Sequence, residues 1–239
     1  MKAMIFAAGL GTRLQNETIT KPKALVEIGG KPLLQRAIEK LKNEGISEIV
    51  VNVHHFSDLV ISFIKEKDFG IPVHISDETE NLLDTGGGLK KAARFFVGAE
   101  PVLVYNVDII SNMNFSQLIA EHRKSGALVT LVVRNRKTQR YFKFDAEKRL
   151  VGWINRKTGE TKVSNSENFD KAIEMAYSGI HIFNPEIFPL MPETDRFSVT
   201  DFYLELAKTQ KIMGFYDDSD LWMDVGKPEQ LEEARRMFN

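Results

Sequence analysis

Short apolar runs alternate with segments of helical periodicity over residues 1–134, and this alternation is what most constrains the fold. Residues 49–53 form a β-branched run interrupted only by Asn52, which is typical of a strand covered on both faces. Residues 33–41 carry apolar side chains at helical spacing, with Pro32 before them and Gly45 after them. Because strands that alternate with helices pair in parallel through right-handed crossovers, we predict an α/β fold with a doubly wound, mostly parallel mixed sheet.

The pattern changes after residue 134. Three segments are typical of strands without helices between them, which favours a small antiparallel subregion; they are residues 141–145, 150–155 and 174–183. The remaining predicted strands are residues 4–8, 72–76 and 101–106, and the remaining predicted helices are residues 56–67, 89–96, 200–209 and 228–237. No repeat, low-complexity tract or linker interrupts the chain, so the sequence predicts one domain over residues 1–239.

Composition excludes several classes of function. The 239-residue chain has a formal net charge of -1, so its bulk charge predicts neither a nucleic-acid partner nor an anionic membrane. It has no cysteine, which excludes disulfides, thiolate metal sites and cysteine nucleophiles and is compatible with a reducing compartment. The apolar run at residues 3–8 is too short for a signal peptide or a membrane span, so we expect a cytoplasmic protein.

A glycine-containing loop, residues 9–14, follows the first predicted strand. Glycines let backbone N–H groups come close to phosphate oxygens, and the guanidinium of Arg13 adds a planar set of donors. The loop is not a dinucleotide-binding fingerprint, since Leu14 occupies the place of the third glycine, and it lacks the Gly-Lys-Ser/Thr end of a P-loop. A tight strand-to-helix turn is the alternative interpretation of these residues.

A second basic segment, Lys21-Pro22-Lys23, lies a short way downstream. Pro22 stiffens the segment and keeps the preceding residue extended, so Lys23 would be a fixed positive charge over a bound triphosphate. Two solvated lysines in a loop are the alternative interpretation, and for Lys21 it is the preferred one.

The stretches AAGLGTRL and TKPKALVEIGGKPLL together resemble the signature of the sugar-1-phosphate nucleotidylyltransferase family. The close match covers residues 3–34, and weaker matches extend to residues 222–226. The resemblance implies an enzyme with a Rossmann-like, glycosyltransferase-A-like fold. Its nucleotide-binding part would span about residues 1–134 and its sugar-phosphate-binding part about residues 135–239.

The resemblance assigns roles to individual residues on the nucleotide side. Backbone groups that would contact the base and ribose are those of Ala7, Ala8 and Gly9. The residues that would hold the triphosphate are Gly11, Thr12 and Arg13. The glycine-rich segment at residues 83–88 would recognise the base through Thr85, Gly86 and Gly87, although three glycines also suit a flexible start of a helix. Arg13 and Lys23 would be catalytic, with Lys23 stabilising charge on the α-phosphate and the departing pyrophosphate.

Two acidic residues match the metal-binding positions of the family. Asp108 follows the strand predicted at residues 101–106, and ligands of open α/β sheets lie at the carboxyl ends of strands. Asp224 lies within residues 222–226. Since paired carboxylates with phosphate co-ligands suit Mg²⁺, the resemblance implies Mg²⁺ as the cofactor. Loop capping by each Asp is the alternative, and Val107 stands where the family usually has glycine.

The sugar-phosphate side matches the family less closely. Lys157 would contact the sugar phosphate, although its neighbours depart from the family's Glu-Lys-Pro motif. Glu174 would accept hydrogen bonds from sugar hydroxyls, and Gly179 would let the sugar ring approach. An ordinary antiparallel strand is the alternative for these last two residues.

The implied partners are a nucleoside triphosphate and a sugar 1-phosphate, with no nucleic acid and no membrane; nothing in the sequence predicts the oligomeric state. The sugar phosphate already carries an anionic oxygen that attacks the α-phosphorus directly, giving NDP-sugar and pyrophosphate.

The Leu-Asp-Thr-Gly-Gly-Gly stretch resembles the uridylyltransferases of the family, which implies UTP with N-acetylmuramate 1-phosphate of cell-wall recycling as the substrates. GTP with mannose or heptose 1-phosphate is the alternative. Further alternatives are an alcohol-phosphate cytidylyltransferase, a nucleotide-sugar-sensing regulatory subunit, and a Rossmann oxidoreductase, which Leu14 disfavours.

Overall fold

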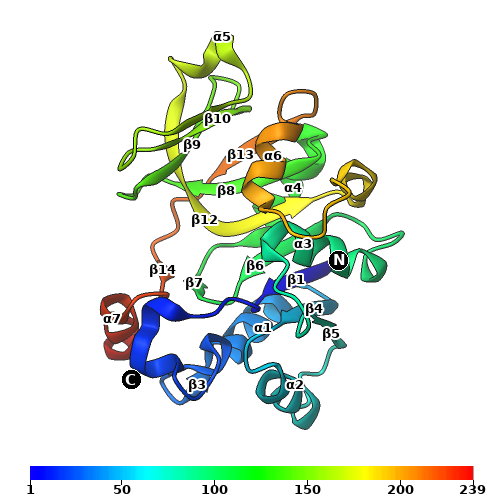
Figure 1. The fold of residues 1–239 in the computed structure, drawn as a ribbon, viewed down its shortest axis with the longest axis vertical. Helices are drawn as coiled ribbons and strands as arrows, with labels where there is room; N and C mark the ends of the chain where they lie inside the picture. Colours follow the sequence, from blue (N-terminus) through cyan, green and yellow to red (C-terminus); the bar gives the residue numbers. More distant parts are fainter. Residues whose placement is uncertain (239) are drawn as a thin grey trace.

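A mixed ten-stranded sheet forms the centre of the protein, whose computed structural model describes residues 1–238 (Figure 1). Four neighbouring strands are parallel, in the order β6 (Val102–Asn106), β1 (Lys2–Phe6), β4 (Glu48–Val53) and β5 (Val73–Asp77). Antiparallel strands continue the sheet beyond β6 as β12 (Ile173–Phe183), β9 (Arg140–Phe144), β10 (Leu150–Asn155) and β11 (Thr161–Val163). β8 (Val129–Arg134) pairs with β12 and with β13 (Ile212–Tyr216). The predicted doubly wound mixed sheet with a small antiparallel subregion is confirmed.

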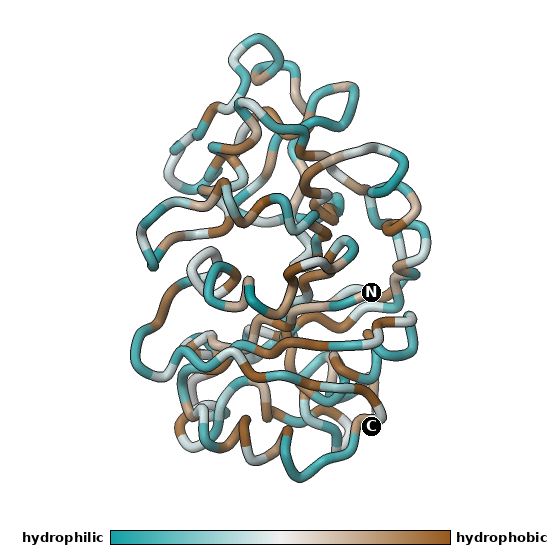
Figure 2. Tube along the Cα trace, turned by 90° about the vertical axis from the view of Figure 1, so that its right-hand side faces the viewer, coloured by the Kyte–Doolittle hydropathy of each residue, from teal (hydrophilic) through white to brown (hydrophobic). Residues whose placement is uncertain are grey.

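Helices cover both faces of the sheet because its parallel strands are apolar on both. In β1, Ala3 and Ile5 face one side while Met4 faces the other, and all three are fully buried. The first face is covered by α1 (Leu33–Asn43), α2 (Ser57–Glu66), α4 (Phe115–Ser125) and α7 (Pro228–Phe238). The second face is covered by α3 (Asp84–Lys91), η3 (Ala92–Phe95) and α6 (Val199–Leu206). In Figure 2 the hydrophobic segments accordingly run through the interior and the hydrophilic ones through the outer loops.

The remaining elements are short. They are the helical turns η1 (Thr12–Thr18), η2 (Lys23–Leu25), α5 (Ser166–Phe169) and η4 (Pro185–Leu190), and two strand pairs, β2 (Glu27–Ile28) with β3 (Lys31–Pro32) and β7 (Ile109–Ser111) with β14 (Trp222–Asp224). Sequence periodicity predicts none of them, because each is too short to show a period. Within residues 1–238, every helix falls short of the length and apolar character that crossing a membrane requires.

Most predicted elements lie within a few residues of their observed bounds, and the strand at 150–155 has the same bounds. The helix predicted at residues 89–96 differs most. It begins earlier, at Asp84, includes the three glycines, and gives way to a 3₁₀ turn at Ala92.

The strand β12 joins the two parts of the sheet. Its first residues pair with β9 and its last residues pair with β6. Its register with β8 shifts between Tyr177 and His181, and within this bulge Gly179 has a φ of 81°. That left-handed backbone favours glycine, and bulges of this kind redirect side chains beside functional sites. The indole N–H of Trp222 donates to the Ser178 carbonyl (2.9 Å), so β14 is attached to the bulge.

A buried polar chain lies behind the bulge. The Tyr177 hydroxyl lies 2.7 Å from one ring nitrogen of His181, and the Tyr203 hydroxyl lies 2.8 Å from the other. Burial lowers the pKa of His181 to about 3, so its ring is neutral in the folded protein. A neutral imidazole has one donor and one acceptor nitrogen, so one tyrosine donates to it and the other accepts from it. These hydrogen bonds connect β12 to α6.

This buried histidine makes stability depend on pH. The unfolded chain takes up a proton near the ordinary histidine pKa of 6.5, whereas the folded protein does so only near 3. The contribution of neutral His181 to the free energy of unfolding is therefore complete above pH 6.5, the pKa of histidine in the unfolded chain. It is lost as the pH falls below that value, by at most about 1.4 kcal/mol per pH unit. We expect His181→Gln to be less stable than the wild type at neutral pH and the difference to narrow in acid. Urea unfolding between about pH 7 and about pH 4.5 measures it, and parallel profiles would contradict the assignment.

Candidate active site

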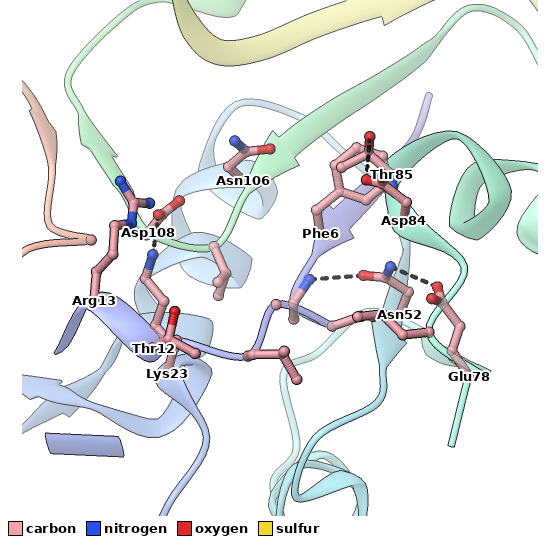
Figure 3. A pocket seen from close by; sticks show the side chains of 18 of the residues that line it. Phe6, Thr12, Arg13, Lys23, Asn52, Glu78, Asp84, Thr85, Asn106 and Asp108 are labelled. Atoms are coloured by element: carbon pink, nitrogen blue, oxygen red, sulfur yellow. Dashed lines mark hydrogen bonds and ion pairs between the residues drawn. The ribbon is translucent and has the colours of Figure 1, made fainter. Parts of the chain in front are cut away.

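A cavity of about 520 Å³ lies at the carboxyl edge of the four parallel strands. Polar groups reach it from the strand ends: the loop after β1, Asn52 near the end of β4, Glu78 after β5 and Asn106 at the end of β6. Open α/β sheets bind ligands at this edge. Of the residues predicted from sequence, those that line the cavity are Ala7, Ala8, Gly9, Gly11, Thr12, Arg13, Lys23, Thr85 and Asp108. Figure 3 shows a basic group of side chains at one end and an amide-carboxyl group at the other.

The glycine loop is folded back on itself at Gly11. Gly11 has a φ of 67°, and its carbonyl accepts from the Leu14 N–H (2.9 Å) and the Thr18 hydroxyl (3.1 Å). Leu14 is buried and anchors the turn, while Thr12 and Arg13 remain exposed at the cavity. The two interpretations of the loop are therefore compatible, because the tight turn places its polar residues where an anionic ligand would bind.

Lys23 is aimed at the same end of the cavity by a short helical turn. The Leu25 N–H donates to the Pro22 carbonyl (2.9 Å), and the fully buried Ala24 fixes the turn against the core. The Lys23 ammonium forms an ion pair with Asp108, and the two side chains are only 11% and 14% exposed.

The position of Asp108 is fixed by the backbone around it. The Val107 N–H donates to the Phe6 carbonyl (3.1 Å), and the Val225 N–H donates to the carbonyl of Asp108 itself (2.9 Å). The Tyr105 hydroxyl donates to the Ile109 carbonyl (2.9 Å). Burial and then the negative charge of Asp108 raise the pKa of Tyr105, which keeps that hydroxyl protonated as a donor.

Asp224 reaches the same place through the β7–β14 pair, in which it lies opposite Ile109, the residue after Asp108. Gly226 shows how tightly the charged groups converge. A β-carbon there would lie 2.8 Å from Asp224 Oδ1, 2.8 Å from Lys23 Nζ and 3.0 Å from Arg13 Nη2. A larger residue would have to move them, so two cations and the Asp224 carboxylate meet at Gly226, and Lys23 is in turn paired with Asp108.

The carboxylates of Asp108 and Asp224 fit a hard divalent cation. Within residues 1–238 no group of three or more His, Cys, Asp or Glu side chains could hold a metal. Mg²⁺ is commonly bound through one or two carboxylates, with water and phosphate oxygens completing its shell.

The other end of the cavity carries a buried amide-carboxyl pair. The Asn52 carbonyl accepts from the Ala7 N–H (2.8 Å), and its amide donates to Glu78 Oε1 (2.7 Å). Burial raises the pKa of Glu78, although the Asn52 amide and the Leu83 N–H oppose that effect. Glu78 Oε2 has no hydrogen-bond partner of normal geometry in the described chain. A buried carboxyl oxygen in this state favours a ligand that donates to it.

Gly86 and Gly87 face the protein rather than the cavity. Their N–H groups donate to the Phe197 carbonyl (2.9 and 3.3 Å). A β-carbon on Gly86 would lie 2.4 Å from the Phe197 ring, and one on Gly87 would lie 2.0 Å from the Asp195 carbonyl oxygen. The glycines therefore let α3 pack against residues 195–197, whereas the neighbouring Thr85 lines the cavity.

The residues predicted on the sugar side lie outside the cavity wall. Lys157 is exposed. Glu174 is paired with Arg156 through two bonds of 2.9 and 2.5 Å. Gly179 packs closely against the active-site backbone, because a β-carbon on it would lie 2.7 Å from Ile109 and 3.1 Å from Asn106 Nδ2. The structure therefore groups the nucleotide-side predictions other than Gly86 and Gly87 around the cavity and separates Lys157 and Glu174 from them.

The cavity residues to which the sequence analysis gave no role include three polar ones: Asn52, Glu78 and Arg196. Two carried a usable signal, since Asn52 interrupts a β-branched run and Glu78 follows a predicted strand directly. Arg196 lies in an irregular loop that only tertiary packing brings to the cavity.

The fold and the site define a class of α/β protein with a cluster of basic and acidic side chains at the carboxyl edge of its sheet. A family model for nucleotidyl transferases matches residues 2–238, and the chain belongs to that family.

Relatives of the chain have different named substrates. It is 34% identical to an N-acetylmuramate alpha-1-phosphate uridylyltransferase of Caulobacter vibrioides, over 95% of this chain and 92% of that protein. It is 32% identical to a mannose-1-phosphate guanyltransferase of Yarrowia lipolytica, over 97% of this chain but 62% of that protein, less than two thirds of its length. The crystal structure of HddC from Yersinia pseudotuberculosis superposes with a TM-score of 0.81 at 23% identity, covering 100% of this chain and 99% of that one.

The packing of Gly87 gives a test that needs no ligand. We expect Gly87→Ala to lower the free energy of unfolding by about 1–3 kcal/mol, because the new methyl group must displace the backbone of Asp195. Lys91→Ala, at an exposed position of the same helix, is the matched control and should change it by less than about 0.5 kcal/mol. Equal stability of the two variants, measured by chemical denaturation, would show that α3 does not rely on the glycine.

Proposed function

We propose that the protein is a sugar-1-phosphate nucleotidylyltransferase, which joins a nucleoside triphosphate to a sugar 1-phosphate and releases pyrophosphate. One observation carries the proposal: Arg13, Lys23 and Asp224 meet at Gly226 in a cavity lined by Asp108. Charge neutralisation and positioning are what phosphoryl-type transfers require from a protein. Retention of all four charged groups argues against the alternative of a regulatory subunit without turnover.

Each residue has a role in this reaction. The loop at Gly11 and the Arg13 guanidinium bind the triphosphate, with its α-phosphate near Lys23. An oxygen of the sugar phosphate forms a new bond to the α-phosphorus, and the bond to the bridging oxygen of pyrophosphate breaks. Lys23 offsets the negative charge that develops on that oxygen. A Mg²⁺ ion held by Asp108 and Asp224 would supply further neutralisation of the phosphates.

For the substrates we propose UTP and N-acetylmuramate 1-phosphate, a reaction of cell-wall recycling in the cytoplasm. The similarity to the Caulobacter uridylyltransferase supports this choice, since it extends over 92% of that protein. Glu78 supports it independently, because a carboxyl oxygen accepts from the ring N–H of uracil but has no such donor to meet on cytosine. Guanine also has a ring N–H, so GTP with mannose or heptose 1-phosphate is the second candidate, which the similarity to the guanyltransferase favours.

Pyrophosphate release from a matrix of triphosphates and sugar 1-phosphates tests the proposal. We expect turnover with UTP and N-acetylmuramate 1-phosphate, little with CTP or ATP, and none in excess EDTA. A preference for GTP would favour the guanyltransferase reaction over the uridylyltransferase reaction. Failure of every pair would refute the proposed activity, and full activity in EDTA would refute the metal role of the two aspartates.

Substitutions at Lys23 distinguish an effect on catalysis from an effect on triphosphate binding. Charge builds on the bridging oxygen only as pyrophosphate departs, so Lys23→Ala should reduce kcat on the order of a hundredfold or more while changing triphosphate affinity little. Lys23→Arg should rescue only part of the loss, because a broad guanidinium does not replace a compact ammonium. Kinetics and calorimetry measure the two quantities.

Lys21→Ala is the control for this experiment, because Lys21 carries a similar charge two positions earlier but does not line the cavity. Equal kinetic damage from Lys21→Ala and Lys23→Ala would show that the wrong lysine was assigned to the nucleotide.

A further inference from the structure

The second substrate would bring a second phosphate group to the site, and the two cations at Gly226 approach from the nucleotide side. Arg13 and Lys23 both come from the segment after β1. Lys157, the residue predicted to meet the sugar phosphate, is exposed. The neighbouring Arg156 is already paired with Glu174. A positive charge facing Asp224 from the other side must therefore come from elsewhere.

Arg136, in the connection after β8, is held beside the active site by β12 and β14. Its guanidinium carbon lies 4.5 Å from the ring centroid of Trp222, and its Nη2 donates to the Tyr177 carbonyl (2.9 Å). Trp222 is in turn hydrogen-bonded to Ser178 in the β12 bulge. Stacking on an indole fixes the plane of a guanidinium and leaves its edge available for hydrogen bonds.

Arg136 lies on the face of β14 that carries the side chain of Asp224. Trp222 and Asp224 are two positions apart, so their side chains lie on the same face of the strand. Arg136, which covers Trp222, lies close enough to Asp224 for the two charges to attract. Burial lowers the pKa of Arg136 and the charge of Asp224 opposes that effect. Gly226, where Asp224 meets Arg13 and Lys23, follows two residues later.

Arg136 has donors to spare, unlike the arginine two positions before it. Arg134 is paired with Asp217 and also donates to the hydroxyl and the carbonyl of Ser219. Arg136 forms no ion pair with any described residue, and its buried Nε has no hydrogen-bond partner among them. A partly buried guanidinium without an acidic partner is stabilised when an anion completes its hydrogen bonds. Arg134 therefore holds the fold, whereas Arg136 is available to a ligand.

We propose that Arg136 binds the phosphate group of the sugar 1-phosphate from the side opposite Arg13 and Lys23. The inference rests on the proposed function and assigns the second substrate's phosphate to a residue other than Lys157. Arg136 orients the attacking oxygen toward the α-phosphorus and offsets the repulsion between the two phosphates. A planar guanidinium suits this task, since it binds phosphate oxygens in pairs.

Kinetics on Arg136→Met test this role, because methionine keeps apolar contact with Trp222 while removing the charge. With the best substrate pair from the matrix, KM for the sugar 1-phosphate should rise on the order of tenfold or more, as expected for a lost charged hydrogen bond. KM for the triphosphate should stay within about twofold, and Arg136→Lys should recover part of the loss. Arg140→Met, at an exposed arginine of the same segment, is the control for general charge loss.

Calorimetric titration of N-acetylmuramate, mannose and glucose 1-phosphates into the wild type and Arg136→Met separates this inference from the proposed activity. Failure of turnover with retained binding that depends on Arg136 would refute the activity alone. An unchanged KM for the sugar 1-phosphate in Arg136→Met would overturn the inference, as would a larger loss in Lys157→Met. A parallel rise in both KM values together with a lowered melting temperature would also overturn it, because it would assign Arg136 a structural role.

Discussion

The ion pair between Lys23 and Asp108 is the contact on which the site depends. It joins the segment after β1 to the end of β6, and both side chains are mostly withdrawn from water. Removing water from two charges is costly, so the pair is stable only where its geometry is held by other bonds. The buried Ala24 under Lys23 and the backbone hydrogen bonds around Asp108 provide that support. The charges are therefore gathered at one place before any ligand arrives.

Many of the residues that line the cavity could be picked out from the sequence because their signals are local. The glycine loop and Asp108 follow predicted strands closely, and the parallel sheet brings its strand ends to one edge. The glycines of α3 show the limit of local reasoning. A glycine indicates that something approaches closely, but it does not say what. At Gly86 and Gly87 the approaching group is the chain's own loop at residues 195–197, which is remote in sequence.

The sugar side was harder to predict for the same physical reason. Its geometry depends on pairings between remote segments, such as β7 with β14, which are too short to show a period. Arg136 looks like one charge within a basic stretch in the sequence. Arg134 also lies over the Trp222 ring, at 5.9 Å compared with 4.5 Å for Arg136, and only the structure shows that Arg134 is paired with Asp217 whereas Arg136 has no acidic partner among the described residues. The sequence gives no signal for the bulge in β12 either, although Gly179 is recognisable as part of it once the register of the strand is known.

The pairing of β14 with β7 also has a consequence for the order in which the protein matures. Asp224 and Gly226 come late in the chain, long after the glycine loop, Lys23 and Asp108. During synthesis the parallel sheet has most of its strands before β14 leaves the ribosome, since domains fold as their segments emerge. Contacts between such remote segments form late, because closing the long intervening chain costs entropy. A growing chain thus builds a scaffold first and acquires its complete charge cluster only when β14 docks, so partly made protein does not engage nucleotides in the finished geometry.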